Sequence, residues 1–230
     1  MIFALSRSIL VTIIVFLSVG TIAVMAQIHG ASSSAQIWTQ RGLVLGIVNA
    51  LILALCVPQI FAVVHRLSFA RYWLFPLLDG VWDAEIRSNF PKILKTYEAA
   101  KSRGPRFDAV SDALSPQEAA AGVIQATVTI RSSLISLTIK VEPLGSTRIS
   151  RSRFALPLWR KPDLPEISYV YEQIDTGPIG PLDARRHFGA GVVTYDDDSG
   201  IIAGDYWTQR RDDLGFNTAG TIRMTRRARA

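Results

Sequence analysis

Hydrophobic and polar residues are arranged in two different ways along this chain. Near the N-terminus, Ser8 to Ala26 and Gly42 to Val64 contain no charged residue over about 19 and 23 positions, enough for one bilayer crossing each. Beyond Arg71, hydrophobic and polar residues alternate over short segments that are separated by turn-forming residues. Alternation with a period of two is typical of half-buried strands. We therefore predict a membrane anchor over residues 1–71 and a strand-rich domain over residues 72–230.

The two uncharged runs flank a short polar loop, so they are predicted to form a helical hairpin with crossings at about 8–26 and 42–64. Pro58 is expected to kink the second crossing. A cleaved signal peptide ending at Ala26 is an alternative for the first run, but that run exceeds the roughly 7–15 residues of a signal core.

The second run also carries small residues four positions apart, which on a helix form a stripe that lets another helix approach closely. The residues of this small-residue stripe are Gly42, Gly46, Ala50 and Ala54. Its partner is either the first crossing of the same chain or a second copy, and the sequence does not separate the two.

The alternating segments predict about eight strands, because residues 122–142 contain two alternating halves around Ser132-Ser133 and read as a β-hairpin. Residues 91–102 read as a short helix that begins at a proline, followed by a loop or partly helical insertion up to about residue 118. Short strands at regular spacing indicate a sandwich or a barrel, and we favour an antiparallel barrel because closure removes exposed strand edges. The strand segments are 80–86, 122–142, 146–156, 166–174, 187–197, 201–211 and 218–227.

Charge supports the same division of the chain. Only Arg7 and Arg41 are charged before His65, and the remaining chain has about four more basic than acidic residues. This small excess suits an anionic ligand or membrane surface and argues against duplex nucleic acid. Basic residues flank the outer ends of both runs, which favours cytoplasmic termini and a multi-pass location in the bacterial inner membrane, with the C-terminal domain in the cytoplasm.

No motif in the chain indicates an enzyme. The sequence has no metalloprotease, serine-hydrolase or phosphate-loop motif, and Cys56 is its single cysteine. His187 is the one histidine away from the membrane flanks, and a lone histidine at the start of a strand is usually structural. The acidic stretch 196–200 lacks a glutamate at the twelfth position of a calcium loop and is better explained as a hairpin turn. We expect no catalytic residue, no metal site and no cofactor.

A set of aromatic and basic residues on the alternating segments is the main candidate for binding. Aromatic faces stack on bases and arginine forks match phosphates, so these groups near one barrel mouth would suit a small, anionic, base-bearing ligand. Alternatively, the tyrosines serve packing and the arginines are solvated, because a one-residue slip in register inverts which set points inward. The candidate ligand-binding residues are Trp82, Arg151, Arg153, Tyr169, Tyr171, Tyr206, Thr208 and Arg210.

Three short motifs lie at the two ends of the strand domain: LLDGVW at 77–82, GDYWTQR at 204–210 and GTIRMTR at 220–226. Together with two N-terminal crossings that lead directly into strands, they resemble the two-transmembrane, β-strand-rich effectors known as CD-NTase-associated TM–β-barrel effectors of the CBASS antiphage systems. The topological match covers nearly the whole chain, the residue match is confined to these ends, and the insertion at 91–118 has no counterpart.

The resemblance implies a sensor of a cyclic dinucleotide second messenger. A ligand bound in the barrel would drive protomers to associate, and the clustered helices would disrupt the inner membrane lipids and kill the infected cell. To drive this association, the ligand must bind the assembled form more tightly than it binds the single protomer. Two other functions stay open: a membrane-anchored lipocalin-like barrel for an apolar small molecule, which the Gly80-x-Trp82 pattern also fits, and an interaction module that couples the membrane to partner proteins.

Overall fold

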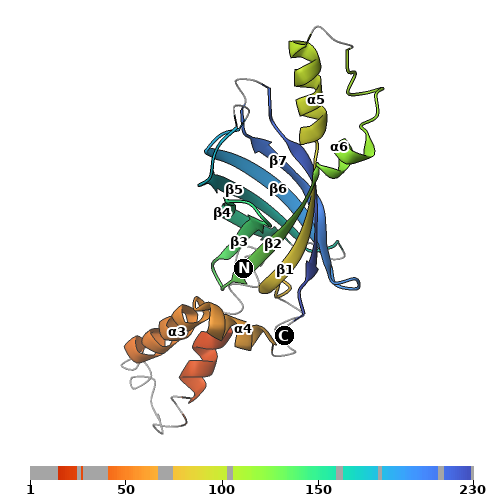
Figure 1. Ribbon diagram of the computed structural model, residues 1–230. Coiled ribbons are helices and arrows are strands. Elements are labelled where there is room, and N and C mark those ends of the chain that lie inside the picture. Colours follow the sequence, from red (N-terminus) through yellow and green to blue (C-terminus); the bar gives the residue numbers. More distant parts are fainter. Residues whose placement is uncertain are drawn as a thin grey trace. The chain divides into compact units, whose positions relative to one another are not determined.

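The fold is taken from a computed structural model of the chain (Figure 1). The structure describes residues 15–24, 27, 41–66, 75–102, 106–158, 163–180, 183–211 and 215–228.

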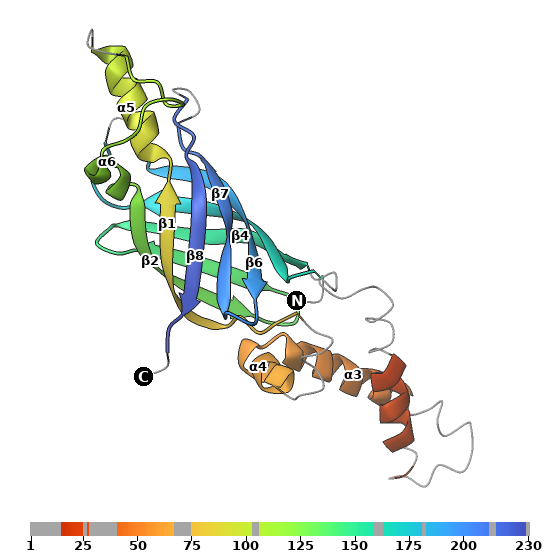
Figure 2. The same ribbon diagram turned by 90° about the vertical axis from the view of Figure 1, so that its right-hand side faces the viewer.

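Eight antiparallel strands form a closed barrel in which each strand pairs with the next along the chain and β8 returns to pair with β1 (Figures 1 and 2). The predicted eight-stranded antiparallel barrel is therefore confirmed, and each predicted segment contains its strand to within a few residues. The strands are β1 (Gly80–Ser88), β2 (Val123–Ser132), β3 (Leu137–Pro143), β4 (Arg148–Leu158), β5 (Glu166–Asp175), β6 (Arg186–Asp196), β7 (Ile201–Gln209) and β8 (Ala219–Arg226).

One end of the barrel is filled by apolar side chains around Trp82, which is completely buried. Its indole nitrogen donates to the Leu78 carbonyl at 2.9 Å, and the Arg226 guanidinium lies 4.6 Å from the centre of its ring. The neighbouring inward residues are small or aliphatic and close this end of the barrel, as expected for a barrel of about eight strands. They include Ala84, Ala126, Val128, Ile130, Ile167, Val193, Ile202 and Met224.

The inward-facing residues become more polar toward the other end. Along β7 they change from buried Ile202 to Tyr206 and Thr208, and along β5 from Ile167 to Tyr169 and Tyr171. The same alternation that marks these segments as strands thus places a core in one half of the barrel and polar groups in the other.

Two helices form an insertion between β1 and β2 at the polar end: α5 (Phe90–Lys101) and α6 (Pro116–Ala120) (Figure 2). The short helix predicted at 91–102 is confirmed. Tyr97 on α5 packs edge-on against buried Phe216, with ring centres 5.1 Å apart. Ser115 and Glu118 form a reciprocal capping box at the start of α6.

The hairpin turn predicted from the acidic stretch 196–200 is also confirmed. Asp196 accepts hydrogen bonds from the Ser199 hydroxyl at 2.6 Å and from the backbone nitrogen of Asp198 at 3.1 Å. Gly200 has φ of 65°, a left-handed conformation that glycine adopts without steric cost.

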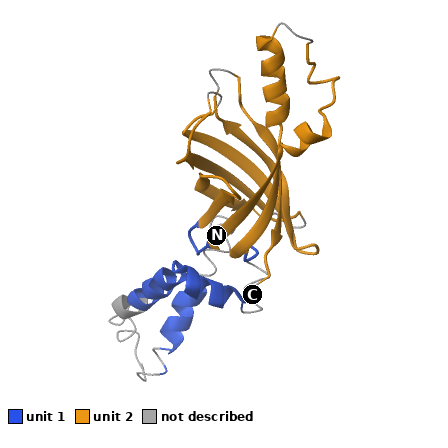
Figure 3. Ribbon diagram, viewed as in Figure 1, with its two compact units in different colours: residues 1–77, 132–136 blue, residues 78–131, 137–230 orange. Residues whose placement is uncertain are grey.

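The chain divides into two compact units, one of residues 78–131 and 137–230 and the other of residues 1–77 with 132–136 (Figure 3). In the second of these, α3 (Arg41–Leu55) and α4 (Pro58–Arg66) are separated by a break. No single helix in the described part of the chain is long and apolar enough to cross a membrane. The segments Leu45–Leu55 and Pro58–Arg66 reach the required length and hydropathy only together, and they are bent by 93°.

The run predicted as one crossing at 42–64 is therefore two helices, because Pro58 has no backbone N–H to continue the helix. The expected kink at Pro58 is confirmed, but the angle of 93° separates two helices and does not bend one continuous helix. Of the run predicted at 8–26, residues 15–24 are helical and the other residues lie outside the described part of the chain.

Gly46, within the small-residue stripe, is turned away from the contact between the helices. Val48 is buried and packs with Leu17, Ile47 and Ile52, whereas a side chain at Gly46 would meet nothing within 4 Å. At 100° per residue, Val48 lies on the face of α3 opposite Gly46. Gly46 is therefore not packed against the described residues of the first helix.

Candidate functional site

A cavity of about 280 Å³ opens inside the polar half of the barrel, at the end that carries α5 and α6. One wall is apolar and comes mainly from β1 to β3; its residues are Ile86, Phe90, Ala121, Ile124, Ile139, Val141, Pro143, Leu144 and Ile222. The other wall is aromatic and polar and comes mainly from β4, β5 and β7; its residues are Ser88, Ser146, Arg148, Ser150, Tyr169, Tyr171, Gln173, Tyr206, Thr208, Arg210 and Thr218.

Tyr169 and Tyr171 lie in this wall because β6 has glycines opposite them. Gly191 pairs with Tyr169 and Gly189 pairs with Tyr171 across the β5–β6 ladder. A Cβ atom at Gly191 would lie 2.6 Å from the Tyr169 ring, and one at Gly189 would lie 2.4 Å from the Tyr171 ring. The glycines therefore leave the space that the two rings occupy, and the rings stand 5.9 Å apart between centres.

Tyr206 belongs to the same aromatic layer. It also pairs with Gly191, from the β7 side, and lines the cavity. Burial raises the pKa of the phenol in all three tyrosines. The tyrosines that line the cavity consequently carry neutral hydroxyl groups at physiological pH.

Two arginines stand at the mouth above the aromatic layer, and two carboxylates hold them. Arg148 donates from Nε to Asp175 at 3.0 Å and from Nη2 to Asp183. The Nε atom of Arg210 lies 3.4 Å from the other carboxylate oxygen of Asp183. Arg210 also lies over the Phe90 ring, with its guanidinium carbon 5.8 Å from the ring centre. Burial lowers the pKa of Arg210, which nevertheless remains a cation.

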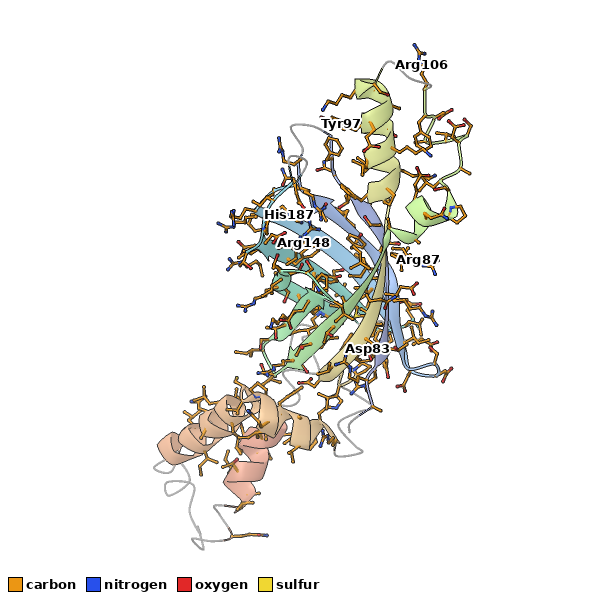
Figure 4. All side chains as sticks on the ribbon, viewed as in Figure 1. Asp83, Arg87, Tyr97, Arg106, Arg148 and His187 are labelled. Atoms are coloured by element: carbon orange, nitrogen blue, oxygen red, sulfur yellow. The ribbon has the colours of Figure 1, made fainter. Side chains whose placement is uncertain are left out.

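His187 lies on the inward face of β6, beside Gln173 in the β5–β6 register and close to Arg148 in Figure 4. Its side chain is buried, and neither ring nitrogen makes a hydrogen bond within the described residues. Burial and then the positive charge of Arg210 lower the pKa of His187 to about 4. The imidazole is therefore neutral at physiological pH.

Thr208 uses its hydroxyl within the barrel. Its Oγ1 lies 2.7 Å from Thr218 Oγ1 and accepts a hydrogen bond from the backbone nitrogen of Thr218 at 3.1 Å. The residue lines the cavity, but these bonds join the end of β7 to the segment before β8 and leave the hydroxyl little freedom to bind a ligand.

Five of the eight candidate residues meet at the cavity, as the alternation of β5 and β7 required. They are Tyr169, Tyr171, Tyr206, Thr208 and Arg210. Trp82 also points inward but lies in the closed half of the barrel, where it is packed under Arg226 and does not reach the cavity.

The structure corrects the placement of Arg151 and Arg153, which lie on the outer wall of β4 and are exposed. Ser150 takes the inward position instead, so Arg151 points outward by alternation. A register shift between Ser152 and Phe154 marks a β-bulge at Arg153. Arg153 donates from Nε to Glu172 at 2.6 Å on the outer wall.

Sequence reasoning missed Arg148, Gln173 and Asp183. Arg148 lies two positions before Ser150 on the inward face of β4, so the correct choice of face would have found it. Gln173 continues the alternation of Tyr169 and Tyr171 on β5 in the same way. Asp183 lies in the connection between β5 and β6, and no pattern in the sequence points to it.

These groups suit recognition of a ligand that carries a flat ring and an anionic group. Buried tyrosine faces can stack on a ring, and the mouth arginines can donate paired hydrogen bonds to oxygen atoms. No group of three or more histidine, cysteine, aspartate or glutamate side chains among the described residues could hold a metal ion.

No protein-family model matches the chain. No curated protein sequence matches it either. The resemblance to the CBASS effectors therefore stays a prediction from the sequence.

Proposed function

We propose that the chain is a membrane-anchored receptor for a cyclic dinucleotide and acts as an effector of bacterial antiphage defence. The observation that carries this proposal is the inward placement of three tyrosines and Arg210 around one cavity. A barrel that carries an apolar molecule would be expected to turn these groups outward. A barrel that binds a base and a phosphate needs them inside.

The size of the cavity limits how such a ligand would bind. Its volume of about 280 Å³ is just below the range of roughly 300–1,000 Å³ that is typical for drug-sized ligands. A whole cyclic dinucleotide is larger than the space available. We therefore propose that one base enters the cavity and lies against the tyrosines, while its phosphate stays at the mouth beside Arg148 and Arg210.

The membrane part of the proposal comes from the hydropathy of the N-terminal runs and from the resemblance. Two crossings would place the barrel on the cytoplasmic side of the inner membrane. The small-residue stripe, exposed at Gly46, is suited to close contact with a second copy. Ligand-driven association of protomers through such helices would disrupt the membrane lipids. The protein itself would need neither an enzymatic activity nor a cofactor other than its activating ligand.

The first test is calorimetric titration of the full chain in detergent micelles with a panel of cyclic dinucleotides. Arg210→Ala is expected to weaken binding by about tenfold or more, because it removes charge-assisted hydrogen bonds worth about 1.5–3 kcal/mol. Arg151→Ala is the matched control, since it removes the same side chain from the outer wall. If no cyclic dinucleotide binds the wild-type protein, the proposed ligand class is wrong.

The second candidate function is binding of an apolar small molecule, which the apolar wall around Ile124 and Ile139 favours. A fluorescent fatty acid would distinguish the two functions. Saturable binding of that probe without any binding of cyclic dinucleotides would establish the second function in place of the first. Under the first function, a cyclic dinucleotide binds and the fatty acid does not.

A further inference from the structure

One carboxylate, that of Asp183, holds both arginines at the mouth of the cavity. Its Oδ2 atom accepts a hydrogen bond from Arg148 Nη2, and its Oδ1 atom lies 3.4 Å from Arg210 Nε. The side chains of Arg210 and Asp183 are only 11% and 13% exposed, so this cluster is shielded from competing water. Asp183 thus uses one oxygen for each guanidinium, as an anion bound between two arginines would.

The charges of the cluster cancel. Arg148 also pairs with Asp175 at 3.0 Å, so two guanidinium groups face two carboxylates. An arriving anionic ligand therefore finds a neutral cluster and not an excess of positive charge. To be bound by the arginines, it must draw their N–H groups away from a carboxylate that is already in place.

Asp183 and a ligand would approach the arginines from different sides. Arg148 and Arg210 line the cavity, and Asp183 is not among the lining residues. The Nε atom of Arg210 is buried and makes no hydrogen bond within the described residues, although the carboxylate lies nearby. The Nε atom is therefore held by charge attraction and can gain a well-formed hydrogen bond by turning toward an anion in the cavity.

We infer that the Asp183 carboxylate competes with the anionic group of the ligand for Arg148 and Arg210. The inference rests on the proposed function in that it takes this group to be a phosphate. When a phosphate replaces the Asp183 carboxylate at the arginines, one charged contact is lost for each one gained, so the net gain in affinity is small. A ligand must therefore bring a ring that is buried against the tyrosines as well as a phosphate. Asp183 makes the cavity selective against phosphate alone.

The test compares full-length wild type, Asp183→Asn and Asp205→Asn in detergent micelles, with inorganic pyrophosphate as the probe. Asp205 is exposed on the outer face of β7, so its substitution gives the same change in net charge away from the cavity. Asp183→Asn is expected to bind pyrophosphate at least about tenfold more tightly than wild type, because a charge-assisted contact no longer has to be broken. Asp205→Asn should bind like wild type.

Equal or weaker binding by Asp183→Asn relative to Asp205→Asn would overturn the inference, since Asp183 would then support the arginines and not compete for them. If Asp183→Asn does not fold, NMR of the wild-type protein provides the test. Saturating pyrophosphate is expected to shift the carboxyl carbon resonance of Asp183, and an unchanged resonance would overturn the inference.

A parallel titration with a cyclic dinucleotide separates the inference from the proposed function. Tighter pyrophosphate binding by Asp183→Asn without any cyclic dinucleotide binding would support the inference and end the proposed function. A cyclic dinucleotide that binds wild type and Asp183→Asn equally would overturn the inference and leave the proposed function intact.

Discussion

The inward-facing side chains at the mouth of the barrel are held by specific partners and not by general packing. Tyr169 and Tyr171 fit against glycines, and Arg148 is fixed by two carboxylates. Groups fixed in this way lose little conformational entropy when a ligand binds.

His187 has no such partner, and this gives a pH prediction. Its pKa is about 4 in the folded protein, below the ordinary value of 6.5, because burial and Arg210 disfavour the charged form. The unfolded chain therefore binds a proton that the folded chain does not bind between about pH 6.5 and pH 4. The free energy of unfolding should fall by at most roughly 3 kcal/mol as the pH drops through this window.

Urea unfolding followed by tryptophan fluorescence would measure this loss in wild type and in His187→Gln. The variant cannot titrate, so its free energy of unfolding should vary less with pH between 6.5 and 4. Hydrogen bonds from Thr147 and Gly177, together with Arg148, lower the pKa of Asp175 to about 2, so the stability that Asp175 contributes is lost at lower pH. Identical pH profiles for wild type and His187→Gln would contradict the assignment of a buried, neutral imidazole.

At the scale of strands and helices, the sequence was sufficient to predict the eight strands and their closure into a barrel. The reason is that β5, β6 and β7 alternate regularly and end at turn residues such as Ser199 and Gly200. The inward face was predictable for β5, where Tyr169 and Tyr171 repeat at every second position, but not for β7, where Tyr206 and Trp207 are adjacent. It was not predictable for β4, whose two faces are both polar and whose bulge at Arg153 changes the register.

The break between α3 and α4 and the cluster around Asp183 needed the three-dimensional structure. The proline indicated a kink but not a bend of 93°. Asp183 lies in a connecting segment and contacts Arg148 and Arg210, which are both far from it in the sequence. Patterns within a single sequence do not indicate such long-range contacts.

The glycines of β6 give a prediction about how the cavity is formed. Gly191→Ala places a Cβ atom 2.6 Å from the Tyr169 ring, so the ring must move or the strands must separate. We expect a loss of about 1–3 kcal/mol in the free energy of unfolding, as for other overpacked cores, together with weaker ligand binding. Gly180→Ala is the control, because a Cβ atom there meets nothing within 4 Å and the position has no positive φ. Wild-type stability and affinity in Gly191→Ala would show that the ring does not depend on this space.

For the whole molecule, the proposal requires that ligand binding in the barrel be coupled to association of the helices. The coupling needs no extended pathway if the ligand binds the assembled form more tightly than the single protomer. The exposed part of the small-residue stripe on α3 is the surface through which the helices of two copies would approach each other.

Gly46→Leu tests this part of the proposal. A Cβ atom at position 46 meets nothing within 4 Å among the described residues, so the protomer should fold normally, whereas close approach of a second helix is blocked. We expect the variant to bind ligand with unchanged affinity but to lose ligand-dependent leakage of dye from liposomes. Gly46→Ala keeps the surface small and should behave like wild type. Undiminished leakage with Gly46→Leu would show that the stripe is not an assembly surface.

The central claim is that a base-bearing ligand lies against the tyrosine wall of the barrel, and photolabelling measures this most directly. An azido-substituted cyclic dinucleotide, cross-linked to the full chain in micelles and mapped by mass spectrometry, should label peptides that contain Tyr169, Tyr171 or Tyr206. Excess unlabelled ligand should abolish this labelling. Labelling of outer-wall peptides alone, or labelling that unlabelled ligand does not reduce, would contradict the account.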